Sequence, residues 1–387
     1  MTPRRLLILG AAAVVVLVGA LLLSNPRSSA DQKPAGALYP DLKEQVNAVT
    51  AVRIFKAGDA KAVEVQRKDA EWNVVERSGY PADVAKVRKL LLALAQARPL
   101  EEKTSNPENY PTLGVEDVSD AKATGVRIEL EGTPKPVSLI LGKAGSGANS
   151  TYVRRAGEPA SWLIDQSLTA SANPHDWLRS SVIDIGADRV QSATITLGNA
   201  KPYSAAKKTR ADADFTVDGL PKGKQLSAPS AANGFASALS ALTLADVRPS
   251  SDFAADKPIA HATYRTFDGL VAEVDGWMKD SKHYVSIKTS YDKALAQRFH
   301  VETKAPEKAA DTAAGKSEVK PADAAAADAA KPGAAAPSID AAQKASAANE
   351  KIEDAARINT TLAGWVYEIP EYKYEAIFKP LDSLLKK

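Results

Sequence analysis

Two stretches of this chain run through the same succession of hydrophobic patterns. In the first stretch, apolar and polar positions alternate over Val49–Phe55, and the alternation returns over Ala62–Arg67 and Glu71–Glu76. A two-residue period is typical of a β-strand with one buried face. We therefore expect three antiparallel strands at the start of this stretch.

A helical period follows the three strands. After Pro81, the residues Val84, Val87, Leu91 and Leu94 are spaced so that they share one face of a helix, which should end near Arg98, before Pro99. We expect this amphipathic helix to cover one face of the sheet. Further strands are predicted at Gly125–Glu131, Pro136–Leu141, Ser150–Arg155 and Ser161–Ile164.

The same order of patterns begins again near Val190. Five positions, Pro229, Ala232, Phe235, Leu239 and Leu242, each lie 148 residues after Pro81, Val84, Val87, Leu91 and Leu94. We interpret this as an α+β fold of two tandem β-β-β-α-β-β repeats, with antiparallel sheets that are each covered by one helix. The alternative is two unrelated amphipathic helices.

The first copy carries about 13 residues that the second copy lacks, in the loop Glu101–Val115. Added loops on a repeated scaffold are common places for binding surfaces. A binding site would use the cation, the polar groups and the aromatic ring of Lys103, Thr104, Asn106 and Tyr110. The alternative is a packed loop in which Asn106 and Pro107 set a turn and Gly114 ends it.

The N-terminal residues Leu6–Leu23 contain no charged or hydrogen-bonding side chain. As a helix they would be roughly 27 Å long, close to the hydrocarbon thickness of a bilayer. Arg4 and Arg5 precede them and favour a cytoplasmic N-terminus. We expect a single-pass protein of a bacterial inner membrane, with membrane lipid around residues 6–23 and the bulk of the chain in the periplasm.

The alternative for this segment is a signal peptide that is cleaved near Ala30, which would release the chain into the periplasm. The apolar run is longer than the usual apolar core of a signal peptide, which favours the retained anchor. The chain has no cysteine, so lipid attachment to cysteine, disulfides and Cys-ligated metals are excluded.

Composition changes sharply after residue 303, where Ala, Lys, Asp, Glu and Pro dominate and large apolar side chains are almost absent. Such a segment cannot bury enough surface to offset its ordering entropy, so we predict disorder there. An alternating pattern returns at Trp365–Ile369. The predicted organisation is an N-terminus (1–5), a transmembrane helix (6–23), a linker (24–45), repeat 1 (46–165), a connector (166–189), repeat 2 (190–303), a disordered insert (304–348) and a C-terminal helix, strand and helix on repeat 2 (349–387).

The sequence offers little readable chemistry. The four histidines lack a metal-ligand spacing, and no phosphate loop or serine elbow is complete, so we predict no catalytic residue, no metal site and no cofactor. Among 387 residues the net charge is only +3, and Lys and Arg are interspersed with Asp and Glu, which argues against nucleic-acid binding. An envelope hydrolase would need carboxylates and a histidine to converge in one pocket.

Several long phrases of the sequence resemble one family. They are Tyr80–Val118, His175–Ile185, Gly219–Pro249, Tyr264–Leu270 and Gly364–Ile377. They are similar to the bacterial envelope family known as domain of unknown function 4340 (DUF4340), over most of the chain outside the Ala/Lys/Pro-rich insert. The resemblance implies one N-terminal membrane helix and an extracytoplasmic region, and some members resemble accessory parts of ABC-type export or gliding-associated systems. It implies no catalytic residues.

These patterns lead to three functional hypotheses. The first is a non-enzymatic accessory subunit that binds a protein partner in the inner membrane or periplasm, in an ABC-type transport system. The second is a periplasmic module that binds a glycan or lipid at the loop with Lys103, Thr104, Asn106 and Tyr110. The third is an envelope hydrolase.

Overall fold

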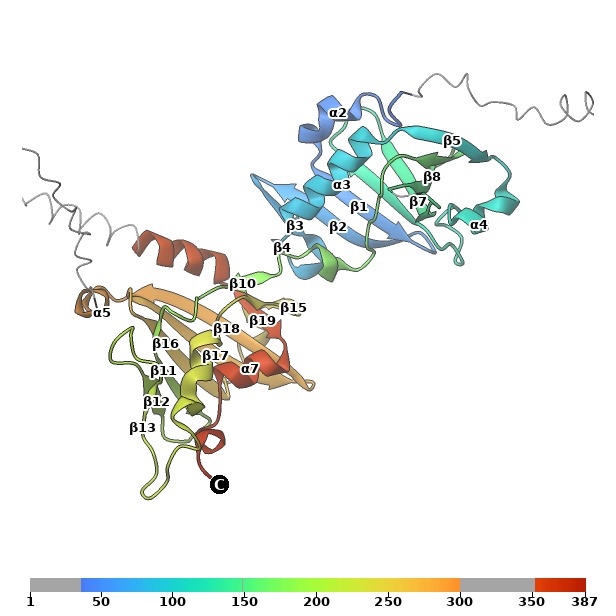
Figure 1. Ribbon diagram of the computed structural model, residues 1–387. Coiled ribbons are helices and arrows are strands. Elements are labelled where there is room, and N and C mark those ends of the chain that lie inside the picture. Colours follow the sequence, from blue (N-terminus) through green and yellow to red (C-terminus); the bar gives the residue numbers. More distant parts are fainter. Residues whose placement is uncertain (1–35, 148, 300–351) are drawn as a thin grey trace, which may run out of the picture. The chain divides into compact units, whose positions relative to one another are not determined.

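The structure is a computed structural model that describes residues 36–147, 149–299 and 352–387. It divides into two units, each treated by itself. The first unit comprises the described parts of Met1–Glu76 and Pro81–Trp177, and the second comprises Arg77–Tyr80 and the described parts of Leu178–Lys387. The fold is mixed α+β, with antiparallel sheets and few helices (Figure 1).

The first sheet has nine strands in the order β4-β3-β2-β1-β6-β7-β8-β9-β5. The strands are β1 (Ala51–Lys56), β2 (Ala60–Lys68), β3 (Glu71–Val74), β4 (Tyr80–Pro81), β5 (Pro99–Thr104), β6 (Val126–Glu131), β7 (Val137–Ala144), β8 (Thr151–Arg155) and β9 (Ser161–Ile164). The helices of this part are α2 (Leu42–Gln45), α3 (Val84–Gln96) and α4 (Tyr110–Leu113), with 3₁₀ turns η1 (Val46–Ala48), η2 (Val75–Arg77), η3 (Pro107–Asn109) and η4 (Pro174–Trp177).

The second large sheet has eight strands in the order β13-β12-β11-β16-β17-β18-β19-β15, and β10 pairs with β14 separately. The strands are β10 (Ser181–Ile183), β11 (Val190–Leu197), β12 (Tyr203–Ala206), β13 (Thr216–Asp218), β14 (Leu242–Thr243), β15 (Asp246–Pro249), β16 (Ala260–Thr266), β17 (Leu270–Lys279), β18 (Lys282–Tyr291) and β19 (Trp365–Ile369). The helical elements are η5 (Pro229–Ser237), η6 (Ser250–Phe253), α5 (Lys293–Arg298), a helix at residues 352–362, α7 (Glu371–Ile377) and η7 (Leu381–Leu384).

The two large sheets have the same strand order apart from the two-residue β4 at one edge of the first. Adding ten to each strand number of β3-β2-β1-β6-β7-β8-β9-β5 reproduces the second order. In both units the last strand, β9 or β19, lies between the preceding strand and β5 or β15. Each unit therefore has five strands after its helical segment in this order, where the sequence pattern predicted fewer.

The buried face of the first sheet is built from aliphatic side chains in register. Val52 lies opposite Val65 and Leu130, and Ile54 lies opposite Val63 and Ile128. All six side chains are buried. Burial of branched aliphatic side chains on a pleated surface is a principal source of sheet stability.

Helix α3 lies across one face of the first sheet (Figure 1). Asp83 caps its start by accepting hydrogen bonds from the backbone N–H groups of Ala85 and Lys86, at 3.0 and 3.2 Å. Val87, Leu91 and Leu94 are buried as predicted. Val84 is not, because its side chain lies in the first turn and is 44% exposed.

Two segments predicted as connections prove to be packed. Within the predicted linker 24–45, Leu38 and Leu42 are buried, and the Leu38 N–H donates to the Ala97 carbonyl at 2.7 Å. Within the predicted connector 166–189, Leu168 and Trp177 are buried. These buried apolar residues are isolated within otherwise polar stretches, so an analysis of hydrophobic periodicity does not detect them.

The proposed membrane segment 6–23 and the predicted insert 304–348 lie outside the described residues. No helix in the described part of the chain is long and apolar enough to cross a membrane.

Candidate functional site

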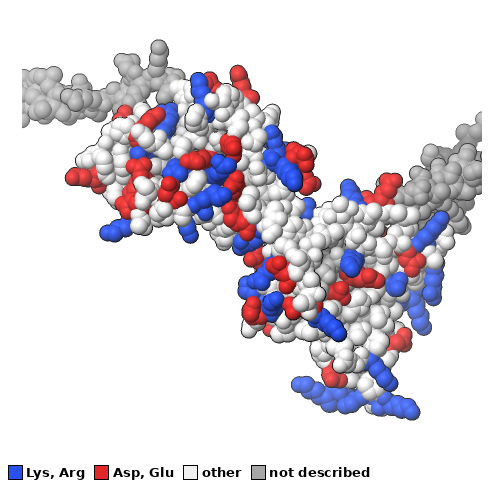
Figure 2. Space-filling model, turned by 180° about the vertical axis from the view of Figure 1, so that it is seen from behind, with Lys and Arg blue, Asp and Glu red and all other residues white. Residues whose placement is uncertain are grey.

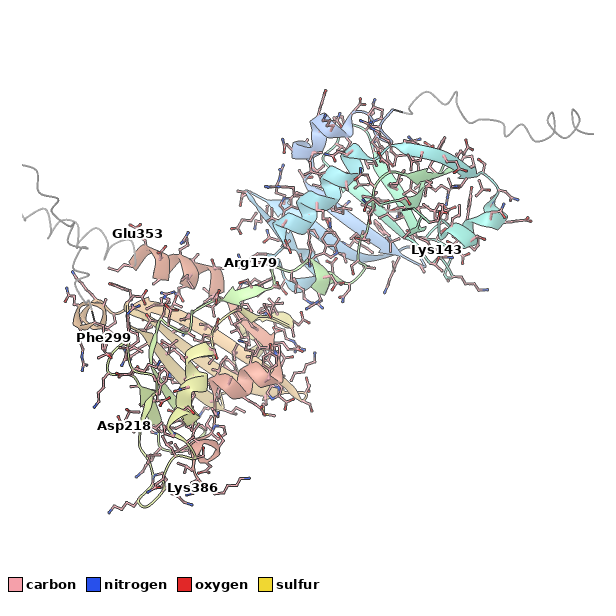
Figure 3. The ribbon with its side chains drawn as sticks, viewed as in Figure 1. Lys143, Arg179, Asp218, Phe299, Glu353 and Lys386 are labelled. Atoms are coloured by element: carbon pink, nitrogen blue, oxygen red, sulfur yellow. The ribbon has the colours of Figure 1, made fainter. Side chains whose placement is uncertain are left out.

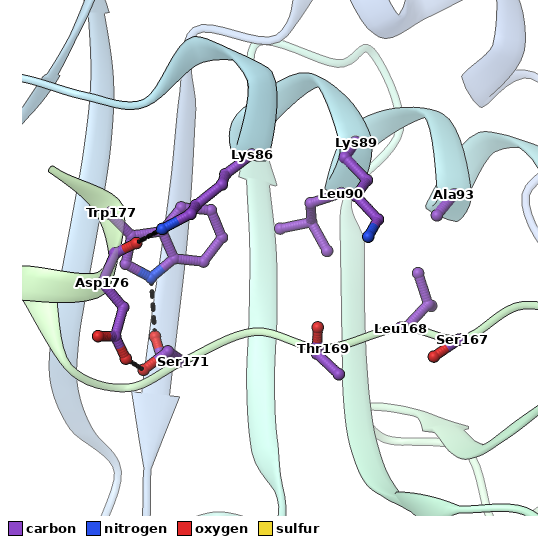
Figure 4. A pocket seen from close by; sticks show the side chains of 10 residues that line it. All are labelled: Lys86, Lys89, Leu90, Ala93, Ser167, Leu168, Thr169, Ser171, Asp176 and Trp177. Carbon is purple, nitrogen blue, oxygen red and sulfur yellow. Dashed lines mark hydrogen bonds between the residues drawn. The ribbon is translucent and has the colours of Figure 1, made fainter. Parts of the chain in front are cut away.

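A hollow of about 260 Å³ lies in the first unit between α3 and residues 167–177 (Figure 4). We call it the α3 groove. Its floor is apolar and includes Leu90, Ala93 and Leu168, while its rim carries polar side chains. The rim residues are Lys86, Lys89, Ser167, Thr169, Ser171 and Asp176.

The wall opposite α3 is held by hydrogen bonds to the sheet. The hydroxyl of Thr151 on β8 donates to the Gln166 carbonyl at 2.9 Å and accepts from the Leu168 N–H at 3.0 Å. The buried Trp177 indole donates to the Ser171 carbonyl at 2.9 Å. The groove is therefore bounded by fixed backbone on both sides.

One end of the α3 groove is closed by a polar cluster. The ammonium of Lys86 donates to the Asp176 carbonyl at 2.7 Å, and the Ser171 hydroxyl donates to the Asp176 carboxylate at 2.5 Å. The bond from Ser171, with smaller contributions from His175 and Lys86, lowers the pKa of Asp176. The Asp176 carboxylate is therefore already engaged in a hydrogen bond within the chain.

Lys89 differs from Lys86, although both project from the exposed side of α3. In the described part of the chain, Lys89 has neither an ion pair nor a side-chain hydrogen bond. Ser167 and Thr169, on the facing wall, also have uncommitted hydroxyls within that part. The groove thus offers a cation and two hydroxyls above an apolar floor.

The residues predicted from the loop Glu101–Val115 do not converge on a cavity. Lys103 pairs with Glu101 at 2.5 Å on strand β5, a strand that the sequence pattern had read as part of the loop. The Thr104 hydroxyl accepts from the Asn106 N–H at 3.1 Å. Tyr110 is buried, and its hydroxyl donates to the Pro159 carbonyl at 2.7 Å.

The packing of this loop follows the alternative interpretation of the sequence. Asn106 caps η3 through a bond from the Glu108 N–H at 3.1 Å. Gly114 ends α4 with a φ of 73°, a left-handed conformation that favours glycine. The ammonium of Lys143, a residue labelled in Figure 3, donates to the carbonyls of Pro111 and Thr112 in α4.

A histidine, a carboxylate and a hydroxyl lie together on the second sheet. His261 Nδ1 is 2.8 Å from the Asp275 carboxylate, and His261 Nε2 is 3.4 Å from the Thr263 hydroxyl. The three come from the paired strands β16 and β17, where His261 faces Asp275 directly. They stand on an open strand face, and the 3.4 Å separation exceeds the hydrogen-bond reach of an activated nucleophile.

We also looked for side chains that could bind a metal ion. Across residues 36–147, 149–299 and 352–387, no cluster of three or more His, Asp or Glu side chains has a geometry that could hold a metal ion.

The sequence reading missed the α3 groove because half of it lies in the predicted connector. A signal was present in the pair Lys86 and Lys89, which lie three residues apart on the polar face of a well-defined helix. The opposite wall, Ser167 to Trp177, gave no periodic signal.

Large antiparallel sheets with few helices place this molecule in the α+β class. The comparison with known families is specific. The sequence model of the family described as a domain of unknown function (DUF4340) matches residues 72–265, half of the chain, and the chain belongs to this family. Neither the curated proteins nor the solved structures contain a significant match.

Proposed function

We propose that this protein is a non-enzymatic, membrane-anchored binding protein whose α3 groove receives a short segment of a protein partner. The observation that carries the proposal is the groove itself, with an uncommitted Lys89 above the apolar Leu90, Ala93 and Leu168. Its chemistry favours a segment that presents an apolar side chain next to a carboxylate.

The size of the groove supports a peptide segment over a whole small molecule. At about 260 Å³ it is smaller than the 300–1,000 Å³ or so of typical ligand pockets. One or two side chains of a partner would fill it. The remaining contact would come from the surrounding surface, as in protein interfaces with a buried centre and a polar rim.

The proposal includes a duplicated scaffold. Its support is the shared strand order of the two sheets, together with the offset of 148 residues between Val87 and Phe235, which are both buried. Two copies of one unit can diverge in surface while they retain one strand order. Partner binding would then have developed on one copy only.

The proposal also includes the membrane anchor and the partner class. Support for the anchor is the uninterrupted apolar run Leu6–Leu23 after Arg4 and Arg5. The resemblance within the family points to the membrane component of an ABC-type transporter as the partner. A reporter enzyme fused after Lys387 should be active only outside the cytoplasm, and cytoplasmic activity would contradict the anchor's orientation.

Photocrosslinking in cells tests the groove. A photoreactive amino acid at Ala93, on the groove floor, should trap a discrete protein partner, whereas the same probe at the exposed Leu92 should not. Lys89→Glu should weaken the crosslink at least several-fold because it reverses the groove's free charge. Equal crosslinking from both positions, or crosslinks to no protein, would refute partner binding at the groove; a partner without transport components would refute only the transporter assignment.

The glycan- or lipid-binding alternative has weaker support. It used Tyr110 and Lys103, but the Tyr110 hydroxyl already donates to Pro159 and Lys103 already pairs with Glu101. Full complementation of a deletion strain by Lys103→Ala would remove it. The hydrolase alternative needs carboxylates and a histidine in one pocket, whereas the neighbouring His261 and Asp275 line neither of the two hollows described.

A further inference from the structure

Five exposed lysines meet at one end of the second unit, which we call the lysine end. They are Lys201, Lys222, Lys224, Lys386 and Lys387. Backbone contacts bring them together, because the Lys386 N–H donates to the Gln225 carbonyl at 2.8 Å and Leu226 forms a bridge with Leu385. Figure 3 shows Lys386 beside the loop that follows Asp218.

The turn that carries Lys201 adjoins this loop. A Cβ atom added at Gly219 would lie 3.5 Å from the Pro202 carbonyl oxygen and 3.3 Å from the Tyr203 Cβ. The β11–β12 turn and the loop 219–225 are therefore in contact. Three separate segments of the chain contribute to one basic surface.

The lysine end has a surplus of positive charge. In the described part of the chain none of its five lysines forms an ion pair. Within four residues of the five lysines along the sequence, the acidic side chains are only Asp218 and Asp382. Figure 2 shows Lys and Arg side chains projecting from this end with few acidic neighbours.

Exposed apolar side chains adjoin the same end. Ile259 and Met278 are 47% and 57% exposed and line one hollow with Trp277. The Gly198 N–H donates to the Ile259 carbonyl at 2.8 Å, which joins the hollow to the turn of Lys201. Single exposed apolar residues are ordinary, but two that line a single hollow beside a basic surface indicate a contact site.

We propose that the lysine end and the neighbouring Ile259 and Met278 dock on an anionic lipid surface. Lysines near such a surface each add attraction, while apolar side chains enter the boundary between headgroups and acyl chains. This contact uses residues different from those of the α3 groove and of the proposed N-terminal anchor, so it can be tested separately from both.

The composition of the lysine end favours lipid over nucleic acid. All five cations are lysines, which act as flexible point charges and lack the planar fork of arginine. Among the five lysines there is no exposed aromatic side chain on which a base could stack, and in the neighbouring hollow the Trp277 ring packs against the Phe253 ring. These features suit a headgroup layer.

The absence of cysteine makes a single-label test direct. The full chain with Asn199→Cys, an exposed position in the turn, carries an environment-sensitive dye and is mixed with vesicles of phosphatidylglycerol and phosphatidylcholine, or of phosphatidylcholine alone. We expect a lipid-like emission shift only with the anionic vesicles, and its loss at high salt. A second label at Ser24→Cys reports the N-terminal segment separately, so failure of the anchor and failure of docking are distinguishable.

Substitution of the lysines provides the quantitative measure. Lys222→Gln with Lys224→Gln should lower the ratio of docked to undocked protein by about 25-fold, since each lysine near an anionic surface contributes about fivefold. The matched control, Lys288→Gln with Lys293→Gln, removes two exposed lysines elsewhere in the same unit and should leave docking unchanged. Lys222→Arg with Lys224→Arg should retain docking because the charge is kept.

Three results would overturn the proposal. They are equal emission shifts with both vesicle types, docking by the Lys222→Gln and Lys224→Gln variant at the level of the control, and binding of the lysine end to duplex or single-stranded DNA without docking on anionic vesicles.

Discussion

The two units share a strand order but build their cores from different side chains. In the first unit, the inward positions of β1 and β6 are aliphatic, such as Val52, Ile54 and Ile128. In the second unit, the equivalent strands carry Ala193 and Ala262 beside Tyr264, all fully buried. Strand order therefore depends on the pattern of buried positions more than on which apolar residue fills them.

The small residues of the second unit allow its C-terminal segment to approach the sheet. The Tyr264 hydroxyl donates to the Ile377 carbonyl at 2.9 Å, and the Tyr203 hydroxyl donates to the Lys379 carbonyl. A Cβ atom at Gly276 would lie 2.6 Å from the Phe378 ring. The C-terminal residues thus complete the core of the second unit, whereas the first unit has no such addition among its described residues.

The helical segments of the two units also differ. Helix α3 has an Asp83 cap and a run of good helix formers, whereas η5 begins after Ala228, which makes no side-chain cap, and contains Gly234. Ser, Asn and Gly are weaker helix formers than the Leu, Lys and Arg of α3. The second unit therefore holds a shorter 3₁₀ segment in place by burying Phe235.

The largest expected difference in stability between the units concerns the buried side chain of Phe235. Phe235→Ala should destabilise the second unit by about 3–5 kcal/mol, because it removes a fully buried ring. Val87→Ala, at the corresponding position of α3, should cost the first unit about 2 kcal/mol. Denaturation in urea, followed by thiol labelling of a buried reporter cysteine at Ala95 or Ala262, measures each unit separately in this cysteine-free chain. Equal losses would show that η5 depends on Phe235 no more than α3 depends on Val87.

Alkaline pH should lower the stability of the second unit more than that of the first. Burial raises the pKa of Tyr203, Tyr264 and Tyr367 in the second unit, and raises the pKa of Tyr39 in the first unit to about 12. The folded state keeps these protons where the unfolded chain loses them, so the stabilisation is complete below about pH 10 and declines as the pH rises.

At pH 11 each of these buried tyrosines should cost about 1.4 kcal/mol, or about 4 kcal/mol for Tyr203, Tyr264 and Tyr367 together, against about 1.4 kcal/mol for Tyr39. The same reporter cysteines, compared at pH 8 and pH 11, measure the difference. A first unit that loses as much stability as the second would contradict the role assigned to the buried tyrosines.

A matched pair of glycine substitutions gives the smallest effect. Gly276→Ala should destabilise the second unit by about 1–3 kcal/mol, because the new methyl group collides with Phe378 and Tyr374. Gly234→Ala in η5 meets no atom within 4 Å and should be neutral or stabilising by up to about 1 kcal/mol. Thermal unfolding of both variants, with the label at Ala262→Cys, checks the sign of each; a neutral Gly276→Ala would mean that the C-terminal segment moves away without cost.

The sequence predicted those parts of the fold that depend on local pattern. The period of Val87, Leu91 and Leu94, between Pro81 and Pro99, defines α3 within a few residues. The alternation around Val52 and Ile54 gives β1, since a two-residue period places both side chains on one face. The resemblance to the DUF4340 family also came from the sequence alone.

Tertiary structure decided how distant segments meet. Lys89 faces Thr169 across the α3 groove, and Lys386 adjoins Gln225, because hydrogen bonds between backbones far apart in the chain fix those neighbours. Tyr110 was assigned to a binding loop from its residue type, but its burial depends on Arg154 and Pro159, some forty to fifty residues away. Periodicity reports which face of an element is buried; it carries no information about the partner, since register and loop packing are set by non-local contacts.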